Sequence, residues 1–303
     1  MKRVLITGGT GLIGTAIIKT LVKNEYKVNL LSRSEGSYLG CKKYKWNPKE
    51  GTIDLKAFEN IDYIVHLAGE SIANGRLNEK HKKAVLQSRL NSTALLKSAL
   101  TKTKTPIKKI ICASAVGFYG DRPMEILTEG SLPGDDFISK TTYLWEKETK
   151  SLKETGTEVY RIRIANVLSS EGGFLPKLLL PFKLGIGSSL GSGKQYFPWI
   201  HIQDVVNAIQ FIMEKNSSHY VFNLCSPQQI NNEYFSKTLA RVLKRPFWVP
   251  NVPKFALKLI LGDLSKAVLA SQQIEPKNLL EEGFKYEFKN LEKALKNILT
   301  HAD

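Results

Sequence analysis

The feature that most constrains this chain is a glycine-rich turn between a strand and a helix near the start of the sequence. Residues 2–7 form a run of β-branched and apolar side chains that predicts a buried strand, and residues 12–22 carry apolar side chains at helical spacing. Between them, glycines stand at positions 8, 11 and 14. Glycines at this spacing suit three needs of such a turn. They allow a backbone conformation with positive φ, they let the backbone approach a ligand without a Cβ in the way, and they let the helix pack closely on the strand.

The turn predicts a dinucleotide phosphate site at the head of the first helix. Unpaired backbone amides and the positive end of the helix dipole meet at this point, where Rossmann-type proteins bind a pyrophosphate. The expected binding residues are Gly8, Thr10, Gly11, Leu12, Ile13 and Gly14.

The pattern beyond the turn alternates between strands and helices, which favours an α/β fold with a doubly wound parallel sheet of the Rossmann type. The expected strands cover 27–32, 62–67, 108–114, 158–164 and 220–224, the expected helices cover 79–100, 139–154 and 202–214, and residues 44–54 predict a hairpin. After Asn166, a glycine-rich stretch with one helix and a helical tail (232–243, 254–261, 276–282 and 291–299) predict a smaller, mainly helical unit. We therefore expect a nucleotide-binding domain at 1–166 with about 201–224, and a substrate-side domain at 167–200 and 225–303.

The end of the second expected strand predicts which cofactor binds. NAD selectivity in this fold usually needs an acidic residue about 20 positions past the glycines, which accepts a hydrogen bond from the ribose. This chain has Ser32-Arg33-Ser34 there, and an arginine suits a 2′-phosphate. Ser32 and Arg33 are therefore expected to bind NADP(H), which is favoured over NAD(H). A plain surface role for Arg33 is the alternative.

The overall charge is strongly basic, with 44 Lys and Arg residues against 28 Asp and Glu and a formal net charge of +16. The cations are spread along the chain and are mostly lysine, which indicates a solvated surface and no nucleic-acid partner. No run approaches about 18 consecutive apolar residues, so we expect no membrane partner. The three scattered cysteines and the scattered histidines predict no metal site, and indicate a reducing compartment, which we take to be the cytoplasm.

Several segments, in order along nearly the whole chain, resemble one known family. They are TGGTGLIG (7–14), VHLAGESIANGRL (65–77), SRLNSTALL (88–96), SAVGFYGD (114–121), PGDDF (133–137), RIANVL (163–168), LGSGKQYFPWIHIQDVV (190–206) and PKNLLEEGF (276–284). The chain resembles the extended and atypical short-chain dehydrogenase/reductases of the NAD-dependent epimerase/dehydratase group. More narrowly, it resembles the branch termed epimerase family proteins, which carries a C-terminal domain of unknown function.

The resemblance implies further cofactor contacts. The segment that resembles the loop along the adenosine and ribose is Leu67-Ala68-Gly69, and Arg89 falls on the first turns of the following helix, where relatives often carry an Asn. Residues 199–204 resemble the edge of the family's substrate cleft. Arg163, Asn166 and Val167 resemble the family's strand-end motif beside the nicotinamide, and Ala113 and Ile164 are expected as further cofactor contacts.

The usual catalytic pair of the superfamily, Tyr-x-x-x-Lys, is missing from the place where the resemblance puts it. Positions 136–138 hold Asp, Phe and Ile, and the literal match at Tyr143 and Lys147 comes about five residues too late. We expect Ser114, Tyr119 or Glu70 to serve instead. The alternatives are capping or packing for Ser114, core packing for Tyr119 and a capping role for Glu70.

These observations favour an NADP(H)-dependent oxidoreductase, or an epimerase that uses transient hydride transfer, with a small-molecule substrate between the strand ends and the tail. The lysines would suit an anionic substrate. The missing pair supports one alternative, a catalytically silent NADP(H)-binding sensor or scaffold. The sequence leaves the substrate, the direction of reaction and the oligomeric state open.

Overall fold

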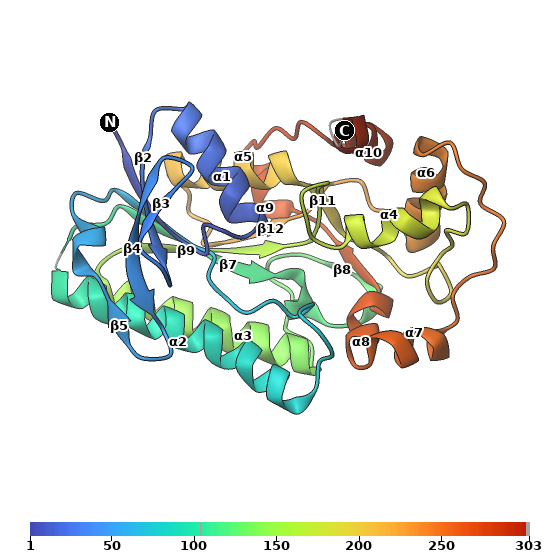
Figure 1. Ribbon diagram of the computed structural model, residues 1–303, viewed down its shortest axis with the longest axis horizontal. Helices are drawn as coiled ribbons and strands as arrows, with labels where there is room; N and C mark the ends of the chain where they lie inside the picture. The colour runs from blue at the N-terminus through green and yellow to red at the C-terminus, as the bar shows by residue number, and fades with distance from the viewer. Residues whose placement is uncertain (104, 301–303) are drawn as a thin grey trace.

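A twisted sheet of mainly parallel strands forms the centre of the molecule in the computed structural model, which describes residues 1–103 and 105–300 (Figure 1). Its strands lie in the order β12-β9-β7-β6-β1-β2-β4-β3. From β12 to β4 every pairing is parallel, and β3 and β5 pair with β4 in the antiparallel sense. The strand bounds are β1 Arg3–Thr7, β2 Lys27–Ser32, β3 Gly36–Tyr38, β4 Cys41–Asn47, β5 Thr52–Ile53, β6 Tyr63–His66, β7 Lys109–Ala115, β9 Glu158–Ile164 and β12 Val221–Leu224.

The strand order reverses direction between β1 and β6, which is where folds of this kind bind ligands. The chain runs outward from β1 to β2 and β4, then returns to the other side of β1 and continues through β6, β7, β9 and β12. The crevice outside the carboxyl ends of the strands at such a switch point is the usual ligand site. The predicted doubly wound Rossmann-type sheet is therefore confirmed.

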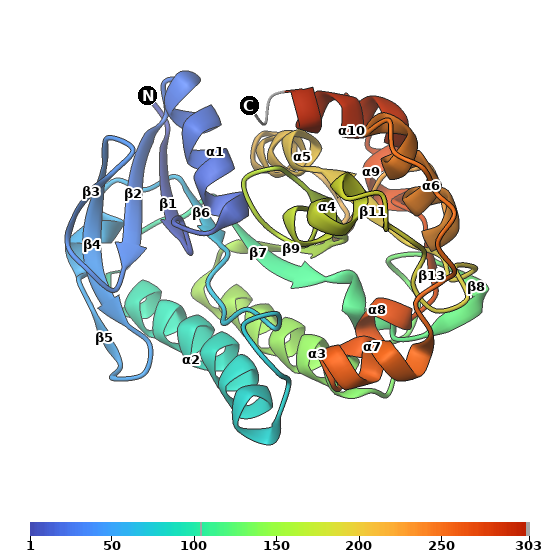
Figure 2. The same ribbon diagram turned by 45° about the vertical axis from the view of Figure 1, so that its right-hand side comes forward.

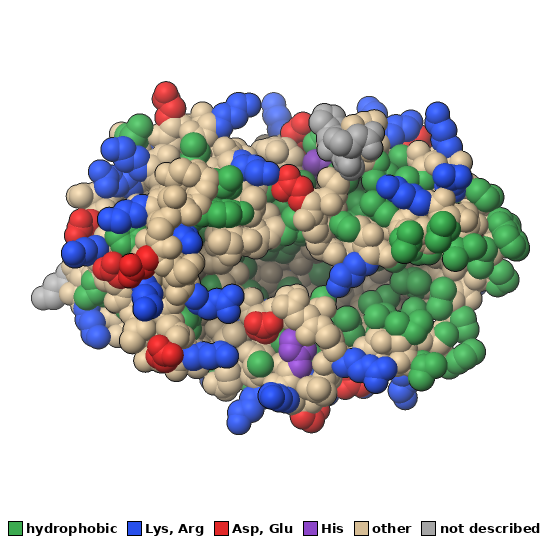
Figure 3. Space-filling model, viewed as in Figure 1, with side chains coloured by type: hydrophobic (Ala, Val, Ile, Leu, Met, Phe, Trp, Pro, Cys, Tyr) green, Lys and Arg blue, Asp and Glu red, His purple; other side chains and the backbone are tan. Residues whose placement is uncertain are grey.

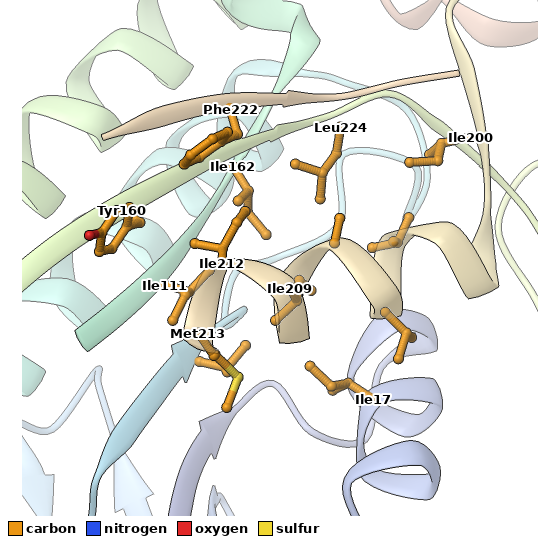
Figure 4. Packing of buried hydrophobic residues seen from close by; sticks show 14 of the residues in the cluster. Ile17, Ile111, Tyr160, Ile162, Ile200, Ile209, Ile212, Met213, Phe222 and Leu224 are labelled. Atoms are coloured by element: carbon orange, nitrogen blue, oxygen red, sulfur yellow. The ribbon is translucent and has the colours of Figure 1, made fainter. Parts of the chain in front are cut away.

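Helices cover both faces of the sheet (Figure 2). On one face lie α1 (Leu12–Lys23) and α5 (Ile202–Glu214), and on the other lie α2 (Glu79–Thr103) and α3 (Phe137–Lys150). Figure 4 shows Ile209 and Ile212 of α5 packed toward Ile162 and Phe222 of the strands, and all four are almost fully buried. Apolar residues recur along α5 at the spacing of one helix face, which explains why this segment forms a helix against the sheet.

A separate cluster of buried apolar residues lies away from the sheet and brings together two stretches of chain that are distant in sequence. It contains Trp199 and Leu175 from the first stretch, and Phe235 and Leu295 from the second. The mainly helical unit that the sequence predicts is thus present. The elements of this part of the chain are β10 Asn166–Leu168, α4 Leu175–Lys183, β11 Trp199–His201, α6 Asn232–Val242, α7 Lys254–Leu261, α8 Leu264–Leu269, α9 Lys277–Glu281 and α10 Leu291–Thr300. Of these, α9 packs against β12 of the main sheet, and β13 Gln272–Ile274 pairs with β8 Arg122–Leu127 of the first part of the chain as a small separate sheet.

The sequence placed most long elements correctly and missed short ones. The predicted hairpin exists as β4 and β5, but β4 starts earlier than expected and adds a parallel strand beside β2. The elements α8, β8 and β13 were not expected. Every helix in 1–103 and 105–300 is too short or too polar to serve as a membrane span.

Candidate functional site

The glycine turn between β1 and α1 adopts the shape that its spacing predicts. Gly8 has φ +69°, in the left-handed region, and a Cβ there would lie 2.8 Å from the carbonyl carbon of Leu67. A Cβ on Gly14 would lie 2.3 Å from the carbonyl oxygen of Gly8. Both contacts are with backbone, which cannot move aside cheaply. The fold itself therefore requires glycine at positions 8 and 14.

Gly11 has no such structural reason to be a glycine. Its φ is −81°, which any residue adopts, and a Cβ would meet only the Gly8 oxygen at 3.4 Å. Thr10 and Gly11 are exposed, whereas Gly9 and Gly14 are buried. The open side of the turn thus faces solvent at Gly11, directly beside the first amides of α1, which have no partner within the helix. This space fits the phosphates of a dinucleotide.

The neighbouring loop is held against the turn by a buried network that starts at Thr7. The Thr7 hydroxyl oxygen accepts hydrogen bonds from the amides of Leu67 (3.2 Å) and Ala68 (3.1 Å). It also lies 2.8 Å from Nδ1 of His66, whose Nε2 lies 3.1 Å from the hydroxyl of Thr93. Burial lowers the pKa of His66 to about 4, so this imidazole is neutral at pH 7. Sequence reasoning missed this support for the 67–69 loop.

Arg89 packs beneath the same loop from the third turn of α2, which begins at Glu79 as the sequence predicts. Its Nη1 donates to the carbonyl oxygens of Glu70 (2.9 Å) and Val85 (2.8 Å). A Cβ on Gly69 would lie 3.3 Å from Cγ of Arg89, so the arginine side chain packs directly against this glycine. The guanidinium lies 4.8 Å from the ring centre of Trp145. Burial lowers the pKa of Arg89 to about 10, which leaves it charged at pH 7. Arg89 thus shapes the loop and adds a cation to this side of the site.

The end of β2 carries the predicted polar and basic group, together with a lysine that the sequence did not single out. Arg33 is exposed and Ser32 is half-buried. Lys43, on the adjacent strand β4, donates to the hydroxyl of Ser34 at 3.0 Å. Lys43 comes close because β4 pairs in parallel with β2, which places Lys43 opposite Leu30, two residues before Ser32. Two cations and two hydroxyls therefore gather at the strand end.

A buried ion pair lies below the carboxyl ends of β7 and β9, next to Ser114. The Ser114 hydroxyl donates to Oε1 of Glu146 at 2.6 Å. Arg163 holds the same carboxylate with two hydrogen bonds, Nε to Oε1 at 2.7 Å and Nη2 to Oε2 at 2.9 Å. All three residues are buried, and Arg161 adds a second cation 3.7 Å from Oε2. The hydroxyl of Ser114 is thus oriented by a carboxylate from α3.

Tyr119 belongs to the same network from its far side. Its hydroxyl donates to Oδ1 of Asn223 at 2.6 Å and accepts from Nη1 of Arg163 at 2.9 Å. The side chain is fully buried, and burial raises the pKa of the phenol even though Arg163 opposes the shift. Arg163 also donates to the carbonyl oxygen of Glu129. The phenol therefore stays protonated and has both of its hydrogen-bond directions occupied.

Glu70 and the literal tyrosine–lysine match lie elsewhere. Glu70 is half-buried in the 67–77 loop, where its Oε1 accepts from the side-chain amide of Asn74 at 3.0 Å. Within the described residues, no hydrogen bond or ion pair joins the Glu70 carboxylate to Ser114. Tyr143 is 47% exposed on the outer side of α3, and Lys147 is exposed as well. Their side chains point away from the buried face that carries Glu146.

The strand ends that the resemblance implied lie around this centre. Ala113 is buried in β7, and Ile164 is half-buried at the end of β9. Asn166 uses its side-chain amide to donate to the carbonyl oxygen of Pro198 at 2.8 Å, which ties β10 to β11. Leu12 and Ile13 are half-buried at the start of α1, and the 172–173 loop lies against Leu12.

His201 and Asp204 are structural in this arrangement. Nδ1 of His201 accepts from the amide of Gln203 and caps α5, and burial lowers the pKa of His201 to about 4. The Asp204 carboxylate accepts from the amides of Glu287 (2.8 Å) and Phe288 (3.0 Å), and so fixes the tail segment. In the part of the chain that the structure describes, no three His, Cys, Asp or Glu side chains are placed to hold a metal ion.

Comparison with known proteins identifies the family. A model described as "NAD dependent epimerase/dehydratase family" matches residues 4–225, and one described as "Domain of unknown function (DUF1731)" matches residues 252–298. This chain belongs to the NAD dependent epimerase/dehydratase family. The predicted family, and the branch with a C-terminal domain of unknown function, are both confirmed.

Relatives within this family match the chain over almost its full length. "Epimerase family protein YfhF" of Bacillus subtilis (strain 168) is 35% identical over 299 residues, which cover 98% of this chain and 97% of the relative. The crystal structure of human epimerase family protein SDR39U1 with NADPH has a TM-score of 0.88 and 35% identity, and the match covers 98% of this chain and 99% of that one. The nucleoside-diphosphate sugar epimerase from Corynebacterium glutamicum has a TM-score of 0.79 and 30% identity over 99% of this chain and 58% of that one.

Proposed function

We propose that this member of the epimerase/dehydratase family binds NADP(H) at the glycine turn and uses it as an oxidoreductase, or as an epimerase with transient hydride transfer, on a small anionic molecule. The observation that carries the proposal is the open turn at Gly11. A glycine that the fold does not need, beside unpaired amides at the head of α1, is explained by a ligand that needs the space. The phosphates would be held by the amides of residues 10–14.

The preference for NADP(H) over NAD(H) rests on the end of β2. Arg33 and Lys43 supply two cations there, and Ser32 and Ser34 supply hydroxyls, which together suit a 2′-phosphate. The human relative at 35% identity was solved with NADPH, which supports the same preference. The Leu67-Ala68-Gly69 loop would lie along the adenosine side, positioned by Thr7 and Arg89.

The proposed division of labour follows the two units of the fold. Residues 1–166 with about 201–224 would hold the cofactor, and residues 167–200 and 225–303 would bind the substrate. Figure 3 shows a hollow in the middle of the face viewed in Figure 1, near the end of β7 and between α4 and α8. A substrate in this region would lie between the two units. The buried, free thiols of Cys41, Cys112 and Cys225 suit the reducing cytoplasm.

When bound, the nicotinamide supplies hydride transfer, and the protein has to place the substrate and move a proton. We assign the proton transfer to Ser114 with Glu146. Because the Ser114 hydroxyl donates to Glu146, its lone pairs are free to accept a proton from a substrate hydroxyl while its own proton passes to the carboxylate. Arg163 is a positioning residue, since it fixes the carboxylate with two hydrogen bonds. Ala113, Ile164 and Asn166 would line the nicotinamide side.

Tyr119 and Glu70 receive smaller roles in this proposal. The Tyr119 phenol is fully buried and bonded to Asn223 and Arg163, so it supports Arg163 and does not exchange protons with substrate. Glu70 is half-buried on a loop whose backbone is tied to Ser88 and Arg89, and its carboxylate accepts from Asn74, so it would contribute to the rim of the cofactor site.

Calorimetry on the full chain tests cofactor binding. NADPH should bind, NADH should bind at least tenfold more weakly, and Gly11→Asp should abolish NADPH binding because the new carboxylate would fill the phosphate space and repel the phosphates. Gly130→Asp is the matched control, since Gly130 is exposed, has no positive φ and has open space around its Cβ position. Equal NADPH binding by Gly11→Asp and by the unmodified protein would refute the proposed site.

A second experiment tests turnover. Anionic aldehydes, ketones and sugar nucleotides are screened for NADPH oxidation at 340 nm, and sugar nucleotides also for epimerisation. With a substrate in hand, Ser114→Ala should lower kcat by about 10²- to 10⁴-fold, the range for loss of a proton-transfer group, with little change in NADPH affinity. Tight NADPH binding without turnover of any compound would favour the silent sensor over the enzyme.

A further inference from the structure

We infer that the end of the molecule formed by α4, the 244–252 loop and α7 is a docking surface for an anionic lipid bilayer. It carries large apolar side chains that contact solvent. Figure 3 shows hydrophobic side chains gathered on this end, over α4, α6 and α7. The exposed members, with their exposed fractions, are Leu180 65%, Leu184 66%, Ile186 54%, Trp248 72%, Phe255 76%, Leu259 76% and Ile260 66%. These seven residues are called the apolar end below.

Contacts between backbones hold the two parts of the apolar end together. The amide of Val252 donates to the carbonyl oxygen of Ser189 at 2.8 Å, and the amide of Gly191 donates to that of Val252 at 2.9 Å. A Cβ on Gly185 would be in van der Waals contact with Pro246. The α4 side and the α7 side are therefore one continuous surface.

The charge on this surface is mainly positive, and the acidic residues at its margins, Glu233 and Asp263, form ion pairs with Lys237 and Lys82. No Asp or Glu occurs in residues 172–203 or in residues 234–262. Six exposed cations accompany the apolar end, and none of the six forms an ion pair with any residue in 1–103 or 105–300. They are Lys177, Lys183, Lys244, Arg245, Lys254 and Lys258.

This combination favours a bilayer over other occupants. A helix with Lys next to exposed Phe and Leu, and a Trp close by, is typical of segments that lie in the membrane interface, where lysine stems run along the apolar region and their ammonium groups reach anionic headgroups. In α7, Lys254 and Lys258 lie next to Phe255 and Leu259 in this way, while Leu257 anchors the helix to the protein. A second copy of the chain on the same surface would bring six cations against six more, which like-charge repulsion opposes.

The inference departs from the sequence prediction of no membrane partner, which considered only spanning segments. Peripheral docking needs no long apolar run. It is also independent of the proposed NADP(H) site, because no residue of the apolar end was assigned to the cofactor. The two proposals can therefore fail separately.

Trp248 gives a direct spectroscopic readout. The chain has four tryptophans, and Trp46, Trp145 and Trp199 are buried at 4%, 5% and 0% exposure. A blue shift of tryptophan emission on binding vesicles would therefore report the burial of Trp248. The Trp248→Phe variant should bind vesicles and lose the shift.

Cosedimentation of the full chain with vesicles of phosphatidylserine and phosphatidylcholine (about 3:7), and of phosphatidylcholine alone, tests the inference. Binding should occur with the anionic vesicles, with the blue shift, and should weaken as salt rises. Each cation near an anionic surface contributes about fivefold, so Lys254→Glu with Lys258→Glu should lower the partition coefficient more than a hundredfold. Phe255→Ser with Leu259→Ser should lower it more than tenfold.

The matched control reverses two exposed lysines at the other end of the molecule, Lys23→Glu with Lys27→Glu, and should change binding by far less. Unchanged NADPH binding and circular dichroism would show that each variant is folded. The inference is overturned if the unmodified chain does not sediment with anionic vesicles, or if the control pair loses as much binding as the α7 pair. A dimer in solution that buries Trp248, shown by sedimentation together with emission, would also overturn it.

Discussion

The three glycines of the phosphate turn offer a test that separates folding from binding. Replacing Gly8, Gly11 or Gly14 in turn by alanine adds the same methyl group in three different surroundings. At Gly14 the methyl would lie 2.3 Å from the Gly8 carbonyl oxygen, and at Gly8 it would lie 2.8 Å from backbone of the 67–69 loop with φ at +69°. At Gly11 its nearest neighbour would be 3.4 Å away.

These surroundings set the expected magnitudes. Forcing a methyl into packed backbone costs about 1–3 kcal/mol or more at Gly14, and a left-handed conformation adds about 1–2 kcal/mol to the clash at Gly8. Gly11 caps α1, where alanine is a poorer cap by about 0.5–1 kcal/mol. Alanine also has fewer conformations than glycine in the unfolded chain, which raises the free energy of unfolding by about 0.4–1 kcal/mol and offsets the weaker cap. The free energy of unfolding of Gly11→Ala should therefore stay within about 1 kcal/mol of the parent.

Urea unfolding measures stability and calorimetry measures NADPH affinity for the same preparations. Gly8→Ala and Gly14→Ala should lose stability, whereas Gly11→Ala should keep it and bind NADPH at least tenfold more weakly, a loss of about 1.4 kcal/mol. If Gly11→Ala binds NADPH as well as the parent does, the open side of the turn does not hold the phosphates. If it unfolds as readily as Gly14→Ala, the space beside Gly11 is not free.

Three further predictions concern charges. Replacing Arg33 and Lys43 together by alanine should weaken NADPH binding by at least tenfold at low salt and leave NADH binding unchanged, as calorimetry can check; equal losses for both nucleotides would contradict a 2′-phosphate site. Folding lowers the pKa of His66 from 6.5 to about 4, so between these two pH values the unfolded state binds a proton that the folded state does not. The free energy of unfolding should therefore be unaffected by this residue above pH 6.5 and should fall by about 3 kcal/mol as the pH drops to 4. Urea unfolding from pH 7 to 4 should show a shallower loss for His66→Gln, and an identical slope would rule this out. Glu146→Gln should lower the free energy of unfolding by about 3–5 kcal/mol because it leaves the Arg163 guanidinium buried without its carboxylate. Adding Arg163→Met to this variant should recover part of the loss. A Glu146→Gln variant as stable as the parent would speak against a strong buried pair.

Much of the fold could be predicted from the sequence because its long elements carry strong local signals. The helix after the glycine turn and α7 were predicted to within one residue of their observed bounds. Short elements were missed because their stability comes from tertiary contact. The strand β13, for example, exists through its pairing with β8 about 150 residues earlier in the chain.

The candidate site divides in the same way. The glycine turn and the end of β2 are local motifs, so spacing alone pointed to them. The Thr7–His66–Thr93 network and the position of Lys43 depend on strand register, which the sequence does not state. Glu146 left a weak signal. It shares the buried face of α3 with Thr142 and Thr149, at helical spacing of four and three residues, and a carboxylate on such a face needs a buried partner.

The buried ion pair changes how the missing tyrosine–lysine pair should be understood. In that pair a lysine makes a phenol acidic enough to exchange protons near neutral pH. Here the group that accepts a hydrogen bond from Ser114 is a carboxylate, and the cation that stabilises it is an arginine. Burial disfavours the charge of Arg163, but its hydrogen bonds to Glu146 outweigh burial and raise its pKa, so the cation persists across the physiological range. The one phenol described in this network, Tyr119, stays protonated because burial raises its pKa, and within the described residues no lysine is hydrogen-bonded to Ser114 or Glu146. The rate of a reaction that depends on Ser114 and Glu146 should therefore not fall between pH 7 and 9 through loss of a catalytic proton, and the exposed Tyr143 and Lys147 should be replaceable without effect on it.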